Sequence, residues 1–247
     1  MRDLLGAEWL KARSQSLLPF LVVGGVVLAT VVVLGLVSQG AADVSAGHDT
    51  VSNVTDQAVR YWMTMHLFSS LFGAVFVTGE YSSHAISRSV LLGGGRDRLF
   101  TAKALAGTAM GVVLGLITAA AAAASPWIFL PAYGLRPEWT TTTWQVLPGV
   151  FAVTVLAAPW GVLVGWICRN QTVAVGLLAV LTMAFEPYLF DLVPAIGKFM
   201  LTIAFASLYL DGDPELLSVP AALAVVAAWF AAAWIIARRL LTTRDIT

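Results

Sequence analysis

Charged residues are scarce in this chain of 247 residues: Asp, Glu, Lys and Arg make up 11% of it, whereas hydrophobic residues make up 59%. An ordinary soluble domain has about 25% charged residues. The composition therefore excludes a large soluble domain with a water-facing surface. Cysteine is almost absent as well, and the single Cys168 excludes an intramolecular disulfide and gives no support for redox chemistry.

Motifs for metal binding and for nucleotide binding are lacking. Three histidines and one cysteine are scattered and form no zinc-ligand pattern. No GxxxxGK[ST] phosphate-binding loop is present, because the glycines 93–95 are followed by Arg96 and Asp97. We expect no metal or cofactor bound by this chain, and no ATPase activity of its own.

Candidate residues for nucleophilic catalysis reduce to one histidine. Only His66 lies in an apolar stretch, three and four residues before Ser69 and Ser70. A hydrolase needs a nucleophile within hydrogen-bond reach of its base, together with an oxyanion site. A histidine bonded to a neighbouring helix is the simpler interpretation, and an intramembrane hydrolase is the alternative.

Six long apolar stretches are what the sequence does have. About 20 helical residues cross a hydrocarbon layer of ~30 Å, and unpaired backbone groups in lipid exclude open strands. The sequence predicts an all-α membrane protein with one transmembrane domain over residues 1–247. The expected spans are residues 17–37, 61–79, 104–130, 144–167, 172–190 and 216–237.

The basic residues predict how these spans are oriented. With both termini inside, the inner segments hold 11 of the 14 Lys and Arg and the outer segments hold 9 of the 14 Asp and Glu, giving formal charges of +6 and −6. The positive-inside rule then predicts a multi-pass protein with cytoplasmic termini. We interpret the basic surface as a topology signal that contacts the lipid bilayer, and expect no nucleic-acid partner.

Three segments outside the spans have their own patterns. Residues 1–16 mix charges with apolar residues, which predicts an interfacial helix on the inner membrane surface. Residues 38–60 are polar and predict an external loop. Residues 195–210 are apolar but only 16 long, and a crossing there would move the basic C-terminal residues outside. They predict a re-entrant or interfacial external segment between the fifth and sixth spans.

Residues 80–103, between the second and third spans, form the longest cytoplasmic connection. Ser82 or Ser83 can cap a short helix, and the glycines 93–95 end it.

Within this short helix the side chains separate into two faces. Ile86 and Val90 form one stripe, while His84 and Arg88 face the opposite side. A helix of this kind can take a push from a soluble partner and pass it to the two spans that it joins. An ordinary basic loop is the alternative.

Glycines at four-residue spacing occur in the third and fourth spans. Small residues on one helix face let helices approach closely in lipid. We expect packing within one subunit, with a subunit interface as the alternative. The helix-packing glycines are Gly107, Gly111, Gly115, Gly161 and Gly165.

Three runs carry a resemblance to a known family. They are GEYSSHAISRSVLLGGGRDRLFTAKALA at residues 79–106, the opening EWLKARSQS at 8–16 and the terminal RRLLTTRDI at 238–246. Together with six spans, they resemble the permease subunits of the ABC-2 family of ATP-driven exporters. The resemblance departs at Ala85, where a hydroxyl residue is common, and at the glycines that replace a common proline.

The resemblance implies a transporter subunit in a bacterial plasma membrane that is not itself an enzyme. Two permeases, identical or different, pair with two ATP-binding cassette subunits that hold ATP and Mg. A cytoplasmic coupling helix between the second and third spans docks into the ATPase. The docking residues implied are Glu80, Tyr81, His84, Ile86, Arg88, Val90 and Leu91.

By the same resemblance, the second and fifth spans line a pathway between the two permeases. An apolar pathway suits a hydrophobic or amphipathic cargo such as a peptide, an antibiotic or other drug, or a lipid. Contact with lipid or packing inside the subunit is the alternative for each lining residue, and a membrane anchor or sensor without transport is the alternative function. The pathway residues implied are Trp62, Met65, Phe68, Phe72, Met183 and Phe185.

Overall fold

The computed structural model describes residues 2–244, and these residues form helices and connections without a strand. Six helices are long and apolar enough to span a membrane, as predicted. The helices are α1 (Arg2–Ser14), α2 (Leu18–Ser45), α3 (Val51–Arg60), η1 (Tyr61–Thr64), α4 (Met65–Ser82), α5 (Ile86–Leu92), α6 (Arg96–Phe129), η2 (Leu130–Tyr133), α7 (Thr141–Cys168), α8 (Gln171–Val180), the π-helical η3 (Leu181–Phe185), α9 (Glu186–Leu192), α10 (Pro194–Gly197), α11 (Leu201–Leu208) and α12 (Val219–Thr243).

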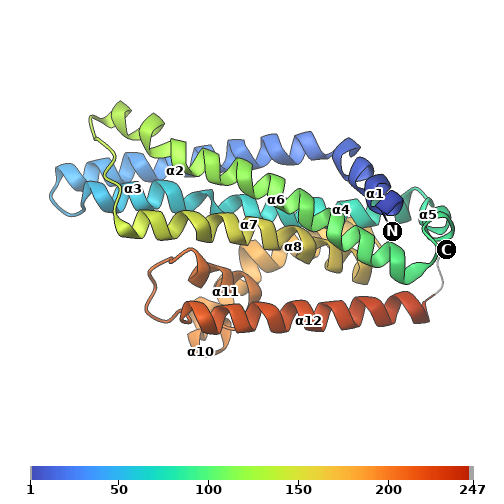
Figure 1. Ribbon diagram of the computed structural model, residues 1–247. Helices are drawn as coiled ribbons and strands as arrows, with labels where there is room; N and C mark the ends of the chain where they lie inside the picture. Colours follow the sequence, from blue (N-terminus) through green and yellow to red (C-terminus); the bar gives the residue numbers. More distant parts are fainter. Residues whose placement is uncertain (1, 245–247) are drawn as a thin grey trace.

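The long helices run side by side and give the molecule two distinct ends (Figure 1). One end holds α1, α5 and the last turns of α12, and we call it the α5 end. The opposite side holds the turn between α2 and α3 and the connection between α6 and α7 at its tip, with the short helices α10 and α11 further inward beside the start of α12, and we call this side the α11 end. This arrangement follows the alternating direction that six spans require.

The prediction of a loop over residues 38–60 is wrong. Helix α2 continues to Ser45, and α3 begins at Val51 after Thr50, whose side chain accepts a hydrogen bond from the Asn53 backbone N–H at 3.3 Å. The polar residues of α3 give the sequence the composition of a loop. The buried face of α3 nevertheless packs against the bundle, where the Ser125 hydroxyl donates to the Ala58 carbonyl at 3.0 Å. The second span is therefore the 32-residue segment Val51–Ser82.

Helix α7 lies at the centre of the bundle, with α4 and α6 packed against it. Where α6 meets α7, a Cβ atom added to Gly107 would lie 2.6 Å from the Val162 side chain. Where α7 meets α4, a Cβ atom on Gly161 would overlap the Ser70 carbonyl oxygen. Glycine at these positions therefore lets α6 and α4 approach α7 more closely than a residue with a Cβ atom would permit. The other predicted packing glycines, Gly111, Gly115 and Gly165, lie at the same two contacts.

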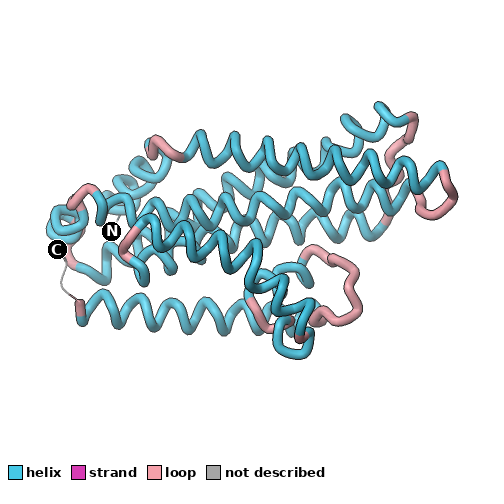
Figure 2. Tube along the Cα trace, turned by 180° about the vertical axis from the view of Figure 1, so that it is seen from behind, coloured by secondary structure: helices cyan, strands magenta, loops and turns pink. Residues whose placement is uncertain are grey.

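The segment between the fifth and sixth spans folds back at the α11 end (Figure 2). Its helices α10 and α11 have 4 and 8 residues, too short to cross a bilayer. The buried Glu186 carboxylate accepts a hydrogen bond from the Thr202 backbone N–H at 2.6 Å, in the first turn of α11. Trp229 of α12 donates its indole N–H to the Phe199 carbonyl at 2.8 Å. These two bonds hold the segment against the bundle.

Gly161→Ala should destabilise the fold by about 1–3 kcal/mol, because the added methyl group overlaps backbone that cannot move independently. The matched control is Gly176→Ala in α8, where a Cβ atom meets nothing within 4 Å. The control should be neutral or stabilising by up to about 1 kcal/mol. Thermal unfolding in detergent, followed by tryptophan fluorescence, measures both. Equal melting temperatures for the two variants would contradict the close α4–α7 contact.

Candidate functional site

A buried lysine lies at the α5 end between two carboxylates. The side chains of Lys103 in α6 and Glu8 in α1 are 0% and 1% exposed. The Lys103 Nζ lies 2.8 Å from Glu8 Oε2, 2.8 Å from Glu80 Oε1 and 4.2 Å from the centre of the Phe76 ring. The ammonium is thus enclosed by two anions and an aromatic face.

A second lysine completes the group at its exposed edge. Lys11 Nζ lies 2.7 Å from Glu8 Oε1, 2.9 Å from Glu80 Oε1 and 3.1 Å from Ser89 Oγ in α5. Burial lowers the pKa of Lys11, but its hydrogen bonds to Glu8 and Glu80 and their negative charges outweigh burial, so the pKa is raised overall. We call Glu8, Lys11, Glu80 and Lys103 the ion cluster.

The ion cluster fixes three helices to one another. An unpaired charge buried in a protein costs several kcal/mol, so each buried member requires its partners. Glu8 comes from α1, Glu80 from the end of α4 and Lys103 from α6, while Lys11 adds the contact to Ser89 of α5. Any displacement of one of these helices therefore acts on the others.

Helix α5 lies beside the ion cluster with one face buried and one exposed. Ile86 is fully buried and Val90 packs partly against the same apolar cluster, as the predicted stripe requires. On the other face, Arg88 is exposed, and Leu91 and Leu92 are each 82% exposed. Two exposed leucines on a seven-residue helix form an apolar tip at the α5 end.

The predicted start of this helix is wrong. The hydroxyls of Ser82 and Ser83 donate to the Gly79 carbonyl at 3.0 and 2.8 Å, within the last turn of α4. Helix α5 begins at Ile86, after Ala85, without a side-chain cap. Ser82 is the last residue of α4 and Ser83 its C-cap, whereas Ala85 occupies the N-cap position of α5, so neither serine is placed to cap α5. The helix ends at Leu92, before the predicted glycines.

The seven residues implied for docking do not share one surface. His84, Arg88 and Leu91 are exposed and Val90 is half-buried. Glu80, in the ion cluster, Tyr81 and Ile86 face the interior, with the Tyr81 ring edge-on to Trp166 at 6.0 Å. The inward members hold α5 in place, and the outward members are available to a partner.

The last turn of α12 is bound by basic residues of other helices. Arg96 donates to the Leu241 carbonyl at 2.9 Å, and Arg169 donates to the Leu240 carbonyl at 2.8 Å. The Leu241 carbonyl is one that a helix C-terminus leaves free, whereas the Leu240 carbonyl also accepts from the Arg244 backbone N–H at 3.1 Å. Of the terminal run that carries the family resemblance, residues 245 and 246 lie outside the described residues.

The residues implied for a transport pathway occupy two different environments. Trp62, Met65 and Phe72 are buried inside the subunit, 4%, 1% and 0% exposed. Phe68 is partly buried beneath α2, near its glycines 24 and 25. Met183 and Phe185 are 63% and 51% exposed on the π-helical turn.

The geometry does not support the hydrolase alternative. His66 Nδ1 lies 2.6 Å from the Met63 carbonyl oxygen, so this histidine bonds within its own chain segment and not to a neighbouring helix as predicted. Ser70 donates to the Leu67 carbonyl at 2.7 Å, and Ser69 donates to the Thr154 carbonyl at 2.7 Å. Both hydroxyl protons are thus bound by backbone oxygens. Among residues 2–244, no three His, Cys, Asp or Glu side chains are placed to hold a metal ion.

Comparison with known proteins agrees with this architecture. A family model described as ABC-2 family transporter protein matches residues 4–185, from α1 to the π-helical turn. The chain belongs to the ABC-2 family. No match to a curated protein was found. Membership in this family makes the chain the membrane component of a transporter. The transmembrane subunits of the family are typically non-catalytic, and the family implies an ABC ATPase as partner. In this ABC-2 protein, α5 lies between the second and third candidate spans, and Lys11 of the ion cluster bonds Ser89 on it.

Sequence reasoning missed the ion cluster. In the sequence, Lys103 counts only among the 11 basic residues of the inner segments, and Glu8 only among the charges of residues 1–16. The three-residue spacing of Glu8 and Lys11 predicts their pairing on one helix face. Nothing local predicts the third partner, because Glu8 and Lys103 are 95 residues apart.

Lys103→Met should destabilise this ABC-2 protein by about 3–5 kcal/mol, because it leaves two buried carboxylates with one lysine between them. Lys11→Met is the matched control: its side chain is 43% exposed, so water screens its charge and the cost should be about 1 kcal/mol or less. Thermal unfolding of purified protein measures the difference. A smaller loss for Lys103→Met than for Lys11→Met would contradict the enclosed geometry.

Proposed function

We propose that the chain is the permease subunit of an ATP-binding cassette exporter in a bacterial plasma membrane, with cytoplasmic termini. It moves a hydrophobic or amphipathic cargo outward, and ATP is hydrolysed by a separate subunit. The observation that carries the proposal is helix α5, which exposes Leu91 and Leu92 while Ile86 anchors it.

The apolar tip of α5 suits a docking helix. Exposed leucines gain about 1.5–3 kcal/mol each when a partner covers them. A rigid attachment is also needed, because a mobile helix would absorb the push of the partner. Ile86 is fully buried, and Lys11 bonds Ser89 of the same helix at 3.1 Å. In this proposal His84, Arg88 and Leu91 contact the ATPase, while Glu80, Tyr81, Ile86 and Val90 hold the docking helix in position.

The ion cluster supports a route from α5 to the spans. Closure of the two ATPases on ATP moves the docking helices. Because Glu8, Glu80 and Lys103 join α1, α4 and α6, these helices move as one group. In the proposal this movement changes access to the pathway from the inner to the outer side of the membrane.

We propose a complex of two permeases, identical or different, with two ATPases, and a pathway between the permeases. Met183 and Phe185 are available on the surface of the fifth span. In the proposal, the second-span residues Trp62, Met65, Phe68 and Phe72 reach the pathway only after α2 separates from that span. Separating α2 breaks few packing contacts, since only 22% of its most apolar 18-residue stretch is buried, against 72% for the second span.

Replacing the two exposed leucines tests docking. Leu91→Ser with Leu92→Ser should weaken ATPase binding by more than about tenfold, because two apolar contacts are lost. Leu10→Ser is the control: Leu10 is 61% exposed at the same end but lies on α1. Co-purification with the ATPase, and ATP hydrolysis by the complex, measure the effect. Unchanged binding by the double variant would favour a different docking surface, and no ATPase bound to the wild type would favour the anchor alternative.

Cysteine labelling tests the orientation. In a Cys168→Ser background, a membrane-impermeant maleimide should label His48→Cys in intact cells and Arg88→Cys only after permeabilisation. Both positions are exposed, at opposite ends of the molecule. Labelling of Arg88→Cys in intact cells would contradict the proposed cytoplasmic docking helix.

A further inference from the structure

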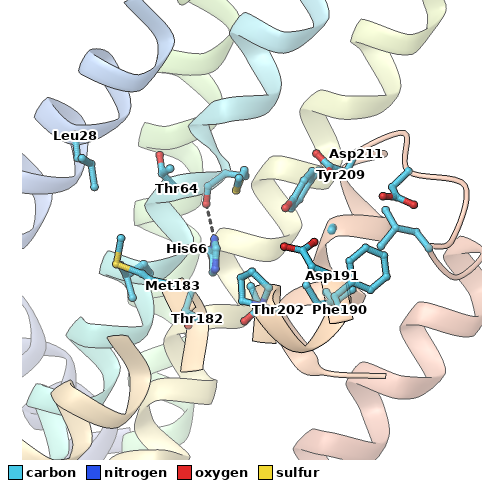
Figure 3. A pocket seen from close by; sticks show the side chains of 17 residues that line it. Leu28, Thr64, His66, Thr182, Met183, Phe190, Asp191, Thr202, Tyr209 and Asp211 are labelled. Atoms are coloured by element: carbon cyan, nitrogen blue, oxygen red, sulfur yellow. Dashed lines mark hydrogen bonds between the residues drawn. The ribbon is translucent and has the colours of Figure 1, made fainter. Parts of the chain in front are cut away.

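A cavity of about 420 Å³ lies near the α11 end, within the range of about 300–1,000 Å³ that ligand pockets occupy. Five parts of the chain line it: α2, the region of α4, the fifth span, α11 and the loop before α12. Figure 3 shows its side chains, with His66 extending into it from α4. The whole cavity lies within one subunit.

His66, which lines this cavity, has an unpaired polar atom buried within the cavity wall. The side chain is 6% exposed, and its Nδ1 lies 2.6 Å from the Met63 carbonyl, which can only accept, so Nδ1 carries the proton. In the neutral ring Nε2 is then an acceptor. This Nε2 atom is buried and has no hydrogen-bond partner among residues 2–244. A buried acceptor without a donor costs about 1–3 kcal/mol, so a ligand that donates to Nε2 would relieve a real cost.

Carboxylates at the cavity are also hydrogen-bond acceptors and would bind a donor. Asp191, Asp211 and Asp213 line it, and none of them takes part in the ion pairs formed within residues 2–244. Burial raises the pKa of Asp211, the positive charge of Arg60 opposes this, and the negative charge of Asp213 adds to it. Asp211 therefore feels the positive charge of Arg60 but forms no ion pair with it among the described residues.

The remaining wall is apolar and is shaped by an irregular helix. Leu67 of α4 and Ile203 and Ala206 of α11 line the cavity. Opposite them, Thr182 and Met183 belong to the π-helical turn of the fifth span. Single π-helical turns within α-helices occur often at functional sites. The cavity thus combines apolar walls with acceptors.

We propose that this cavity binds an amphipathic organic cation. Its ammonium N–H groups donate to His66 Nε2 and to the aspartates, and its apolar part lies against α4 and α11. A bare metal ion fits less well, since no three ligating side chains within the described residues converge. The inference rests on the proposed function in one respect: it names the cargo class as amphipathic cations. Binding itself requires neither ATP nor the ATPase.

Binding of monodansylcadaverine tests the proposal. This fluorescent probe carries a primary ammonium on an apolar chain, and its N-acetylated derivative has the same dye without the charge. With purified permease in nanodiscs, the charged probe should bind at least about tenfold more tightly than the neutral one, as loss of a charged hydrogen bond predicts.

Three variants assign the binding to this cavity. His66→Phe keeps an aromatic ring beside Phe205, whose centre is 6.1 Å away, but removes the acceptor. It and Asp211→Asn should each weaken binding about tenfold. Asp43→Asn is the matched control, an exposed aspartate at the same end on α2. Gel filtration and thermal unfolding verify folding, and if His66→Phe fails to fold, Asp211→Asn decides.

The outcomes separate this inference from the proposed function. Equal binding of both probes, or unchanged binding by Asp211→Asn, overturns the site. Probe binding that depends on Asp211 in a permease that recruits no ATPase supports the site while the proposed function fails. Binding without stimulation of ATP hydrolysis in an active complex overturns the assignment of amphipathic cations as cargo.

Discussion

The buried ammonium of Lys103 is the constraint on which the α5 end depends. A charge with no exposed surface must be compensated where it lies, and here the compensation comes from α1 and α4, with the Phe76 ring beneath. The requirement is positional, because one oxygen of each carboxylate lies 2.8 Å from the Nζ. Helix α1 and the end of α4 are therefore held in register with α6, and α5 is attached to that group through Ile86 and Ser89.

The bundle away from this end divides into a rigid centre and loosely attached outer helices. Glycine contacts bring α7 against α4 and α6, and the apolar windows of the second and fourth spans are 72% and 61% buried. The first, fifth and sixth spans are 22%, 17% and 17% buried. In lipid, packing contacts drive helix association, so a helix with few of them is the one that can move or accept a partner. The first and fifth spans are such helices, and both line the cavity near the α11 end.

Hydropathy and charge alone predicted the class of protein and the six spans, because lipid imposes a length and composition on each crossing. The same reasoning failed at α3, where polarity indicates a loop although Val54 and Ala58 are buried against the bundle. It also failed for the ion cluster, since burial of Lys103 depends on Glu8, which is distant in sequence. His66 stood out in the sequence, but its unpaired Nε2 follows from how Met63 and the cavity lie around it. A sequence pattern describes local structure only. The position of α3, the ion cluster and the unpaired His66 Nε2 all depend on contacts between helices.

Helix α4 connects the two ends, because it carries both His66 and Glu80. These residues are 14 positions apart on one helix, about 21 Å along its axis at 1.5 Å per residue. The ends differ in how their polar groups are satisfied: Glu80 lies between two lysines, whereas His66 Nε2 has no partner among the described residues. A ligand that donates to His66 would act on the first turn of α4, and a push on α5 would act on its last. Between His66 and Glu80, α7 packs closely against α4 where Gly161 meets Ser70. This contact restricts bending of α4, so a displacement at one end of the helix requires an adjustment at the other end.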